Sequence, residues 1–139
     1  MNLLFFCNRM PYSKSGKMKR ISMNYSRGDI VIVPFPFIIS GKQKIQKARP
    51  ALVISEMTVN RRYNDLILAG ITSRVPNNLK ETEMLLESTP VNGLVKKSTL
   101  RLEFVMTVPA EIVSRKVGQL TSQEMKEVDL KISRSLGLR

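Results

Sequence analysis

The chain has 139 residues, the size of one domain with one hydrophobic core, and carries 23 lysines and arginines against 11 aspartates and glutamates. The formal net charge of +12 favours an anionic partner such as RNA, DNA, an acidic protein or a membrane surface, although many small proteins are basic without binding nucleic acid. One cysteine and no histidine exclude an intramolecular disulfide, a cysteine-based metal site and an imidazole base. We therefore expect no metal ion and no other cofactor.

The first 24 residues have no helical or strand periodicity and contain five basic residues and no acidic one. They are interpreted as a disordered basic tail or a mis-annotated start, with a basic arm that adds nonspecific affinity for nucleic acid as the alternative. The apolar run 3–7 is too short for a signal peptide, and no stretch approaches the ~20 apolar residues that span a bilayer. We expect a cytoplasmic protein that does not enter a membrane.

Beyond the tail, short apolar segments separated by turn-forming residues predict strands at 30–37, 48–55, 65–72, 83–87, 99–108 and 111–120. Pro34 and Pro36 cannot donate to a ladder, so the second half of the first strand is expected at an edge or bulge. The lysine-rich segment 38–47 is interpreted as a loop. Short strands at this spacing predict a mainly β protein built on a small barrel.

The C-terminus changes to a helical period. Thr121, followed three residues later by Glu124, forms the pattern of a capping box, and Gly137 supplies a stop signal. Between them runs one apolar stripe, formed by Met125, Val128, Ile132 and Leu136. The sequence therefore predicts a C-terminal helix of about four turns that packs one face on the barrel.

Arg49 stands at the start of one predicted strand, and Thr72 and Ser73 stand at the end of the next. A guanidinium presents a planar fork of donors that matches phosphate oxygens, and a hydroxyl can donate to the same group. We expect the two strand ends to meet at one sheet edge and to bind a phosphate. The alternatives are an arginine that pairs with a carboxylate and ordinary turn chemistry at Thr-Ser.

Arg101 and Glu103 lie two residues apart in a predicted strand and therefore on one side of it. The carboxylate could accept a proton while the arginine neutralises charge. The alternative is an exposed ion pair worth less than about 1 kcal/mol.

Two groups of lysines flank these candidates and would attract phosphate in a salt-dependent manner. One lies before Arg49 and the other after the turn at Gly93; they are Lys42, Lys44, Lys47, Lys96 and Lys97.

Five pieces of the sequence occur in the order of a known family: Arg27-Gly28-Asp29-Ile30-Val31, Phe35-Pro36-Phe37, the run 49–55, Ile71-Thr72-Ser73 and Gly93-Leu94-Val95-Lys96. Over about residues 25 to 138 the chain resembles the MazF/PemK family of toxin endoribonucleases. The resemblance implies that residues 25–139 form an SH3-like barrel of five to seven strands with a C-terminal helix, assembled as a homodimer. It also implies sequence-selective, metal-independent cleavage of single-stranded RNA by 2′-hydroxyl attack, and neutralisation by an acidic antitoxin.

The resemblance further implies that the arginine of the Arg-Pro step and the threonine of the Thr-Ser step are catalytic, which here are Arg49 and Thr72. One branch of the family has Arg-x-Asp where this chain has Arg101-Leu102-Glu103, and it also uses a histidine that this chain lacks. Phe104 stands where that branch often has a polar residue. The acid–base scheme of that branch therefore does not transfer intact, whereas the Arg49 and Thr72 pair is complete.

Two other classes of function remain open on this sequence. A non-catalytic RNA-binding barrel would explain the charge, and a gyrase-poison-like toxin of the same fold would act through protein contacts. Neither class needs the Arg49 and Thr72 pair, so the presence of the pair favours the nuclease.

Overall fold

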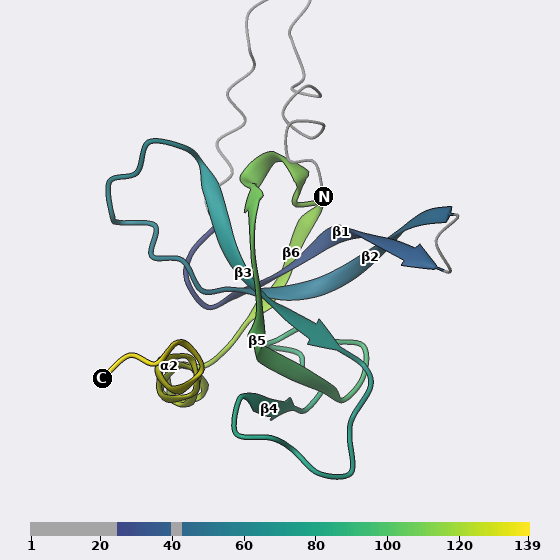
Figure 1. Ribbon diagram of the computed structural model, residues 1–139, viewed down its shortest axis with the longest axis vertical. Coiled ribbons are helices and arrows are strands. Elements are labelled where there is room, and N and C mark those ends of the chain that lie inside the picture. Colours follow the sequence, from purple (N-terminus) through teal and green to yellow (C-terminus); the bar gives the residue numbers. More distant parts are fainter. Residues whose placement is uncertain (1–24, 40–42) are drawn as a thin grey trace, which may run out of the picture.

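In the part of the chain that the structure describes, six strands and one long helix make up the fold (Figure 1). The structure is a computed structural model that describes the backbone of residues 25–39 and 43–139, with the side chains of 25–34 and 47–139. The strands are β1 (Asp29–Ile39), β2 (Gln43–Val53), β3 (Asp65–Thr72), β4 (Glu83–Leu86), β5 (Ser98–Pro109) and β6 (Arg115–Gln119). A 3₁₀-helix, η1 (Ala110–Ile112), precedes β6, and helix α2 (Ser122–Leu136) follows it. The predicted tail, 1–24, lies outside the described residues.

The strands form one antiparallel sheet in the order β4-β5-β3-β2-β1-β6, which curls into a half-barrel (Figure 1). Successive residues of β2 contribute to two core clusters, Leu52 to one and Val53 to the other. Because neighbouring side chains of a strand point to opposite faces, both faces of the central strands are buried. This explains the unbroken apolar runs in the sequence. The prediction of a mainly β barrel with a C-terminal helix is confirmed.

Strands β1 and β2 form a long hairpin that extends away from the rest of the sheet (Figure 1). The prediction of a loop over 38–47 is wrong, because β1 continues to Ile39 and β2 begins at Gln43. Pairing between the two strands overrides the low β propensity of a lysine-rich segment. Pro34 and Pro36 pair with β2, whereas the pairing of β1 with β6 ends at Ile32. The second half of β1 is thus an edge in the described sheet, as the prolines predict.

A wide bulge separates two halves of the β3–β5 ladder. Ala69 pairs with Val105, but the next residue, Gly70, pairs with Arg101. In the bulged segment Leu102 donates its backbone N–H to the Thr82 carbonyl at 2.9 Å. A Cβ at Gly70 would lie 2.7 Å from the Phe104 ring, so only glycine admits the ring there. The bulge redirects β5 toward β4 and fixes where Arg101 lies.

The loop between β4 and β5 closes the half-barrel by packing on β6. The Gln119 N–H donates to the Val91 carbonyl at 3.1 Å. A Cβ at Gly118 would lie 2.3 Å from the backbone of Asn92, and one at Gly93 would lie 2.1 Å from the Val117 carbonyl. Both glycines are therefore required by the close approach of two backbones.

Strand β6 is shorter than predicted. The expected strand over 111–120 is wrong in its first part, because the chain forms η1 there and β6 begins only at Arg115. Pro109 precedes η1 with an extended backbone.

The Arg-Gly-Asp segment before β1 has a structural role. The Arg27 guanidinium donates to the Ile54 carbonyl at 3.0 Å and pairs with Asp129 of α2 at 2.5 Å. The side chain of Asp29 is only 5% exposed, pairs with Lys116 at 3.0 Å and accepts the Ser26 N–H at 2.8 Å. This segment therefore joins the start of the sheet to β6 and the helix.

Helix α2 begins and ends as the sequence predicts. Thr121 and Glu124 form a reciprocal capping box, and Gly137 ends the helix in the left-handed conformation with φ 69°. Val128 is fully buried in the core, and Met125 and Ile132 pack against the same cluster. The end of the stripe differs, because Leu136 is 57% exposed. The helix packs against β5.

Within the part of the chain that the structure describes, no helix has the length and apolarity needed to cross a membrane.

Candidate active site

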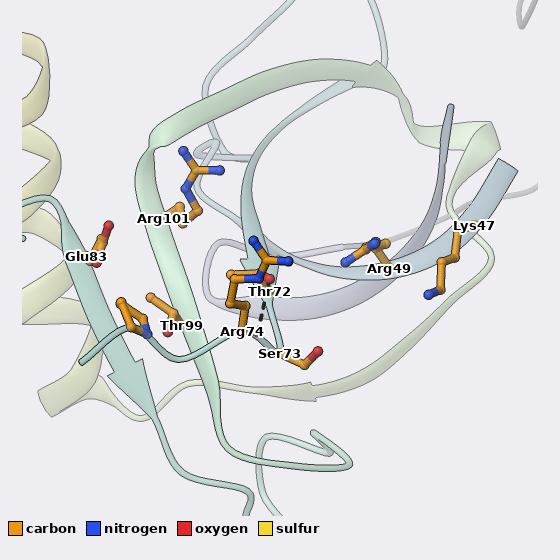
Figure 2. Close-up of a pocket in the computed structure, with 9 residues that line it drawn as sticks. Lys47, Arg49, Thr72, Ser73, Arg74, Glu83, Thr99 and Arg101 are labelled. Atoms are coloured by element: carbon orange, nitrogen blue, oxygen red, sulfur yellow. Dashed lines mark hydrogen bonds between the residues drawn. The ribbon is translucent and has the colours of Figure 1, made fainter. Parts of the chain in front are cut away.

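A groove opens beside the middle of β2 and the end of β3 (Figure 2). Its volume is about 510 Å³. It is lined by Lys47, Arg49, Thr72, Ser73, Arg74, Pro76, Glu83, Thr99 and Arg101. Four of these residues are cationic and one is a carboxylate. The electrostatics of the groove thus suit an anion.

The register of the sheet explains why Arg49 and Thr72 share this groove. Ala51 of β2 pairs with Gly70 of β3, so continuing the antiparallel register by two residues brings Arg49 opposite Thr72. Residues directly opposite each other point to the same face. On its other side Thr72 pairs with Thr99 of β5. Arg49, Thr72 and Ser73 therefore line one groove, as expected, although Arg49 lies within β2 and not at its start.

Thr72 is hydrogen-bonded so that its proton remains available. Its Oγ1 accepts the backbone N–H of Arg74 at 3.2 Å. A hydroxyl that accepts one hydrogen bond can still donate another. The turn after β3 therefore fixes the Thr72 side chain while leaving its O–H able to donate into the groove.

The predicted pair at Arg101 and Glu103 is divided between the groove and its surroundings. The two side chains form an ion pair at 3.2 Å, with 43% and 47% of their surfaces exposed. This is the exposed ion pair that the sequence offered as the alternative to a catalytic role. The Arg101 guanidinium also lies 5.4 Å from the centre of the Phe104 ring. Arg101 lines the groove, whereas Glu103 does not.

Four groove residues were not identified from the sequence: Arg74, Pro76, Glu83 and Thr99. Arg74 follows β3 in what reads as an ordinary turn. Glu83 enters because β4 pairs it with Arg101, and the pairing of β4 becomes visible only once the register is known. Only the Thr-Ser-Arg sequence, with an arginine directly after the candidate hydroxyls, offered a signal.

A second hollow of about 290 Å³ continues the groove along Lys47, Arg49 and Ser73. Its far side is formed by the β4–β5 loop, from Gly93 to Lys96. Lysine and arginine are its only charged lining residues. The two hollows form a path on which a chain of phosphates, or an extended acidic peptide, would meet successive cations.

The five predicted lysines therefore have different positions. Lys47 lines both hollows, and Lys96 lines the second. Lys97 lines neither and pairs with Glu87 at 3.4 Å. Lys42 lies outside the described residues, and Lys44 belongs to β2 by its backbone, with its side chain outside the described part.

The groove does not resemble a metal site. Among the described residues no cluster of three or more acidic or cysteine side chains is present that could hold an ion. Glu83 is the single carboxylate of the groove, and four cations accompany it. This donor set disfavours a divalent cation, which prefers several oxygen ligands.

A third hollow, of about 500 Å³, lies in the β2–β3 loop between Met57 and Asn64 and shares no lining residue with the groove. Backbone and side-chain hydrogen bonds from Thr58 lower the pKa of the exposed Glu56 carboxyl nearby. Arg62 of this loop is exposed and has no ion pair among the described residues.

Comparison with known proteins places this chain in a family. Residues 26–136 match the family described as "PemK-like, MazF-like toxin of type II toxin-antitoxin system". Endoribonuclease MazF of Staphylococcus saprophyticus is 30% identical over 112 residues, which span 81% of this chain and 91% of that protein.

Solved structures share the fold. Toxin MazF-mt6 of Mycobacterium tuberculosis is 23% identical, with a TM-score of 0.62 over 80% of this chain and 98% of that one. A MazE-MazF structure from Deinococcus radiodurans has a TM-score of 0.65 at 19% identity, over 84% and 100% of the two chains. A mycobacterial endoribonuclease in complex with its cognate antitoxin has a TM-score of 0.61 at 18% identity, over 84% and 98%. The chain belongs to the family of PemK-like, MazF-like toxins of type II toxin-antitoxin systems.

Proposed function

We propose that this toxin is an endoribonuclease that cleaves single-stranded RNA, with Arg49 and Thr72 at the catalytic centre. One observation carries the proposal: these two side chains, from different strands, line one groove that is rich in cations. The family and the relative named as an endoribonuclease support the same activity.

The proposed reaction uses the substrate's own nucleophile. The 2′-hydroxyl attacks the adjacent phosphorus, the bond from phosphorus to the 5′-oxygen breaks, and a 2′,3′-cyclic phosphate and a 5′-hydroxyl result. Negative charge grows on the non-bridging oxygens as the five-coordinate state forms. The Arg49 guanidinium stabilises that charge, and the Thr72 hydroxyl donates to the same phosphate. A guanidinium is a poor base, so the role of Arg49 is electrostatic.

Cleavage should proceed in EDTA, because the groove presents one carboxylate among four cations and does not suit a divalent ion. An RNA oligonucleotide and its all-DNA counterpart, incubated with the purified protein with and without chelator, provide the test. The DNA should survive, since it lacks the 2′-hydroxyl. Cleavage that stops with EDTA and returns with magnesium would contradict metal independence, and RNA binding without cleavage would favour a non-catalytic barrel.

The proposal extends to organisation and control. Residues 25–139 form the toxin domain, which acts in the cytoplasm as a homodimer, and the cleavage is sequence-selective. An acidic antitoxin neutralises it by occupying the cationic path formed by the two hollows. The cations of that path and the solved relative that carries its cognate antitoxin support this partner.

A further inference from the structure

Arg74 lines the groove together with Arg49 and Thr72. It is the second residue after the end of β3, and its backbone N–H donates to the Thr72 hydroxyl oxygen at 3.2 Å. In the view of Figure 2 its guanidinium lies next to Thr72, between those of Arg49 and Arg101. The hydrogen bond that fixes Thr72 thus also fixes the start of the Arg74 side chain.

The surrounding charges give this position a preference for an anion. Arg49, Arg74 and Arg101 line one groove, and Arg101 already has a carboxylate partner in Glu103. Arg74 has no ion-pair partner among the described residues, and its side chain is exposed. Like charges in one groove repel one another, and an anion bound between them relieves that repulsion.

From this placement we propose that Arg74 is a second catalytic arginine, which contacts the scissile phosphate together with Arg49. The inference rests on the proposed cleavage of RNA. The scissile phosphate has two non-bridging oxygens, and arginines from β2 and from the turn after β3 can each donate to one of them. Both arginines keep their protons throughout.

The bonding changes balance without a further reactant. The bond from the 2′-oxygen to phosphorus forms and the bond from phosphorus to the 5′-oxygen breaks. The 2′-hydroxyl releases its proton to solvent water, and the 5′-oxygen takes up a proton from solvent water. Because charge on both non-bridging oxygens increases in the five-coordinate state, a second guanidinium stabilises that state more than the bound RNA.

The test compares wild-type protein with Arg74→Ala, Arg74→Lys and Arg62→Ala. Arg62 provides the matched control, because it is an exposed arginine in the β2–β3 loop, outside the groove. In single-turnover cleavage at saturating RNA, Arg74→Ala should lower the rate about 100-fold. Arg74→Lys should give an intermediate rate, because it keeps the charge but loses the fork. Arg62→Ala should cleave like the wild type.

Two further readouts separate a catalytic from a structural role. The thermal midpoint of Arg74→Ala should equal or exceed that of the wild type, since removing one of three neighbouring cations relieves repulsion. Replacing one non-bridging oxygen of the scissile phosphate by sulfur should slow cleavage by the wild type by a larger factor than cleavage by Arg74→Ala. The reason is that the variant has already lost a donor to that phosphate.

Two results for Arg74→Ala would overturn this inference and leave the proposed function standing. One is a cleavage rate equal to that of the wild type. The other is a slowing by sulfur as large as in the wild type, for both diastereomers of the substituted phosphate. A lowered thermal midpoint that accounts for the lost rate would assign Arg74 a structural role instead. A wild-type protein that cleaves no RNA would overturn the proposed function and this inference together.

Discussion

The roles of single residues in the groove depend on which strand supplies them. Arg49 comes from β2 and Thr72 from β3, and both lie just beyond the last recorded pair of these strands, Ala51 with Gly70. Arg101 comes from β5, where the bulge opposite Gly70 places it beside β4. Assembly of the groove thus requires three strands in correct register.

Replacing Arg49 by alanine should abolish detectable cleavage and leave the thermal midpoint nearly unchanged. Losing one contact of this kind to the transition state costs roughly 3–4 kcal/mol, or about two to three decades in rate. Single-turnover cleavage and thermal unfolding of the same preparation check both statements. An Arg49→Ala protein that unfolds would show that this arginine holds the strand rather than the phosphate.

The sequence identified only part of the groove, for physical reasons. Arg49 and Thr72 stand at the ends of apolar runs, where a strand must leave the core, so their place at a sheet edge was predictable. Glu83 and Thr99 depend on the pairing of β4 with β5 and of β5 with β3. That pairing includes a bulge, and a shift of one residue would turn every side chain to the other face.

At the scale of elements, prediction was best where a local signal sets the boundary. Strand β3 has the predicted bounds, and α2 has the predicted caps, because a capping box and a left-handed glycine act within one turn. The β1–β2 hairpin was missed because pairing between strands, rather than the lysines within the segment 43–47, determines its structure.

The contact between the β4–β5 loop and β6 offers a test of closure. Gly118→Ala should destabilise the protein, because its Cβ would lie 2.3 Å from the Asn92 backbone, which cannot rotate away. Overpacking of this kind costs about 1–3 kcal/mol, and backbone contact favours the upper end. Urea unfolding measures the loss in free energy of unfolding.

Gly137→Ala is the matched control. Gly137 has a positive φ, but a Cβ there would have no neighbour within 4 Å, so only the strain of about 1–2 kcal/mol remains. Equal losses of unfolding free energy in the two variants would mean that the β4–β5 loop moves away from β6 at little cost. The contact between this loop and β6 would then be weak.

At the scale of the whole molecule, the net charge of +12 and the cationic path suit more than one polyanion. Single-stranded RNA would meet the path with its phosphates. An acidic antitoxin would meet it with carboxylates on an extended chain, with apolar side chains beside them. The exposed Val95, at the edge of the second hollow next to Lys96, offers one apolar contact for such a chain.

RNA and the antitoxin should therefore compete for the cationic path. An antitoxin bound along the path should exclude RNA, so the apparent inhibition constant should rise in proportion to RNA concentration when cleavage is titrated with antitoxin. Expression of the toxin alone should halt growth, and co-expression of the antitoxin should restore it. An inhibition constant independent of RNA would place the antitoxin away from the path. Normal growth under strong expression of folded, dimeric protein would instead favour the barrel that binds RNA without cleaving it.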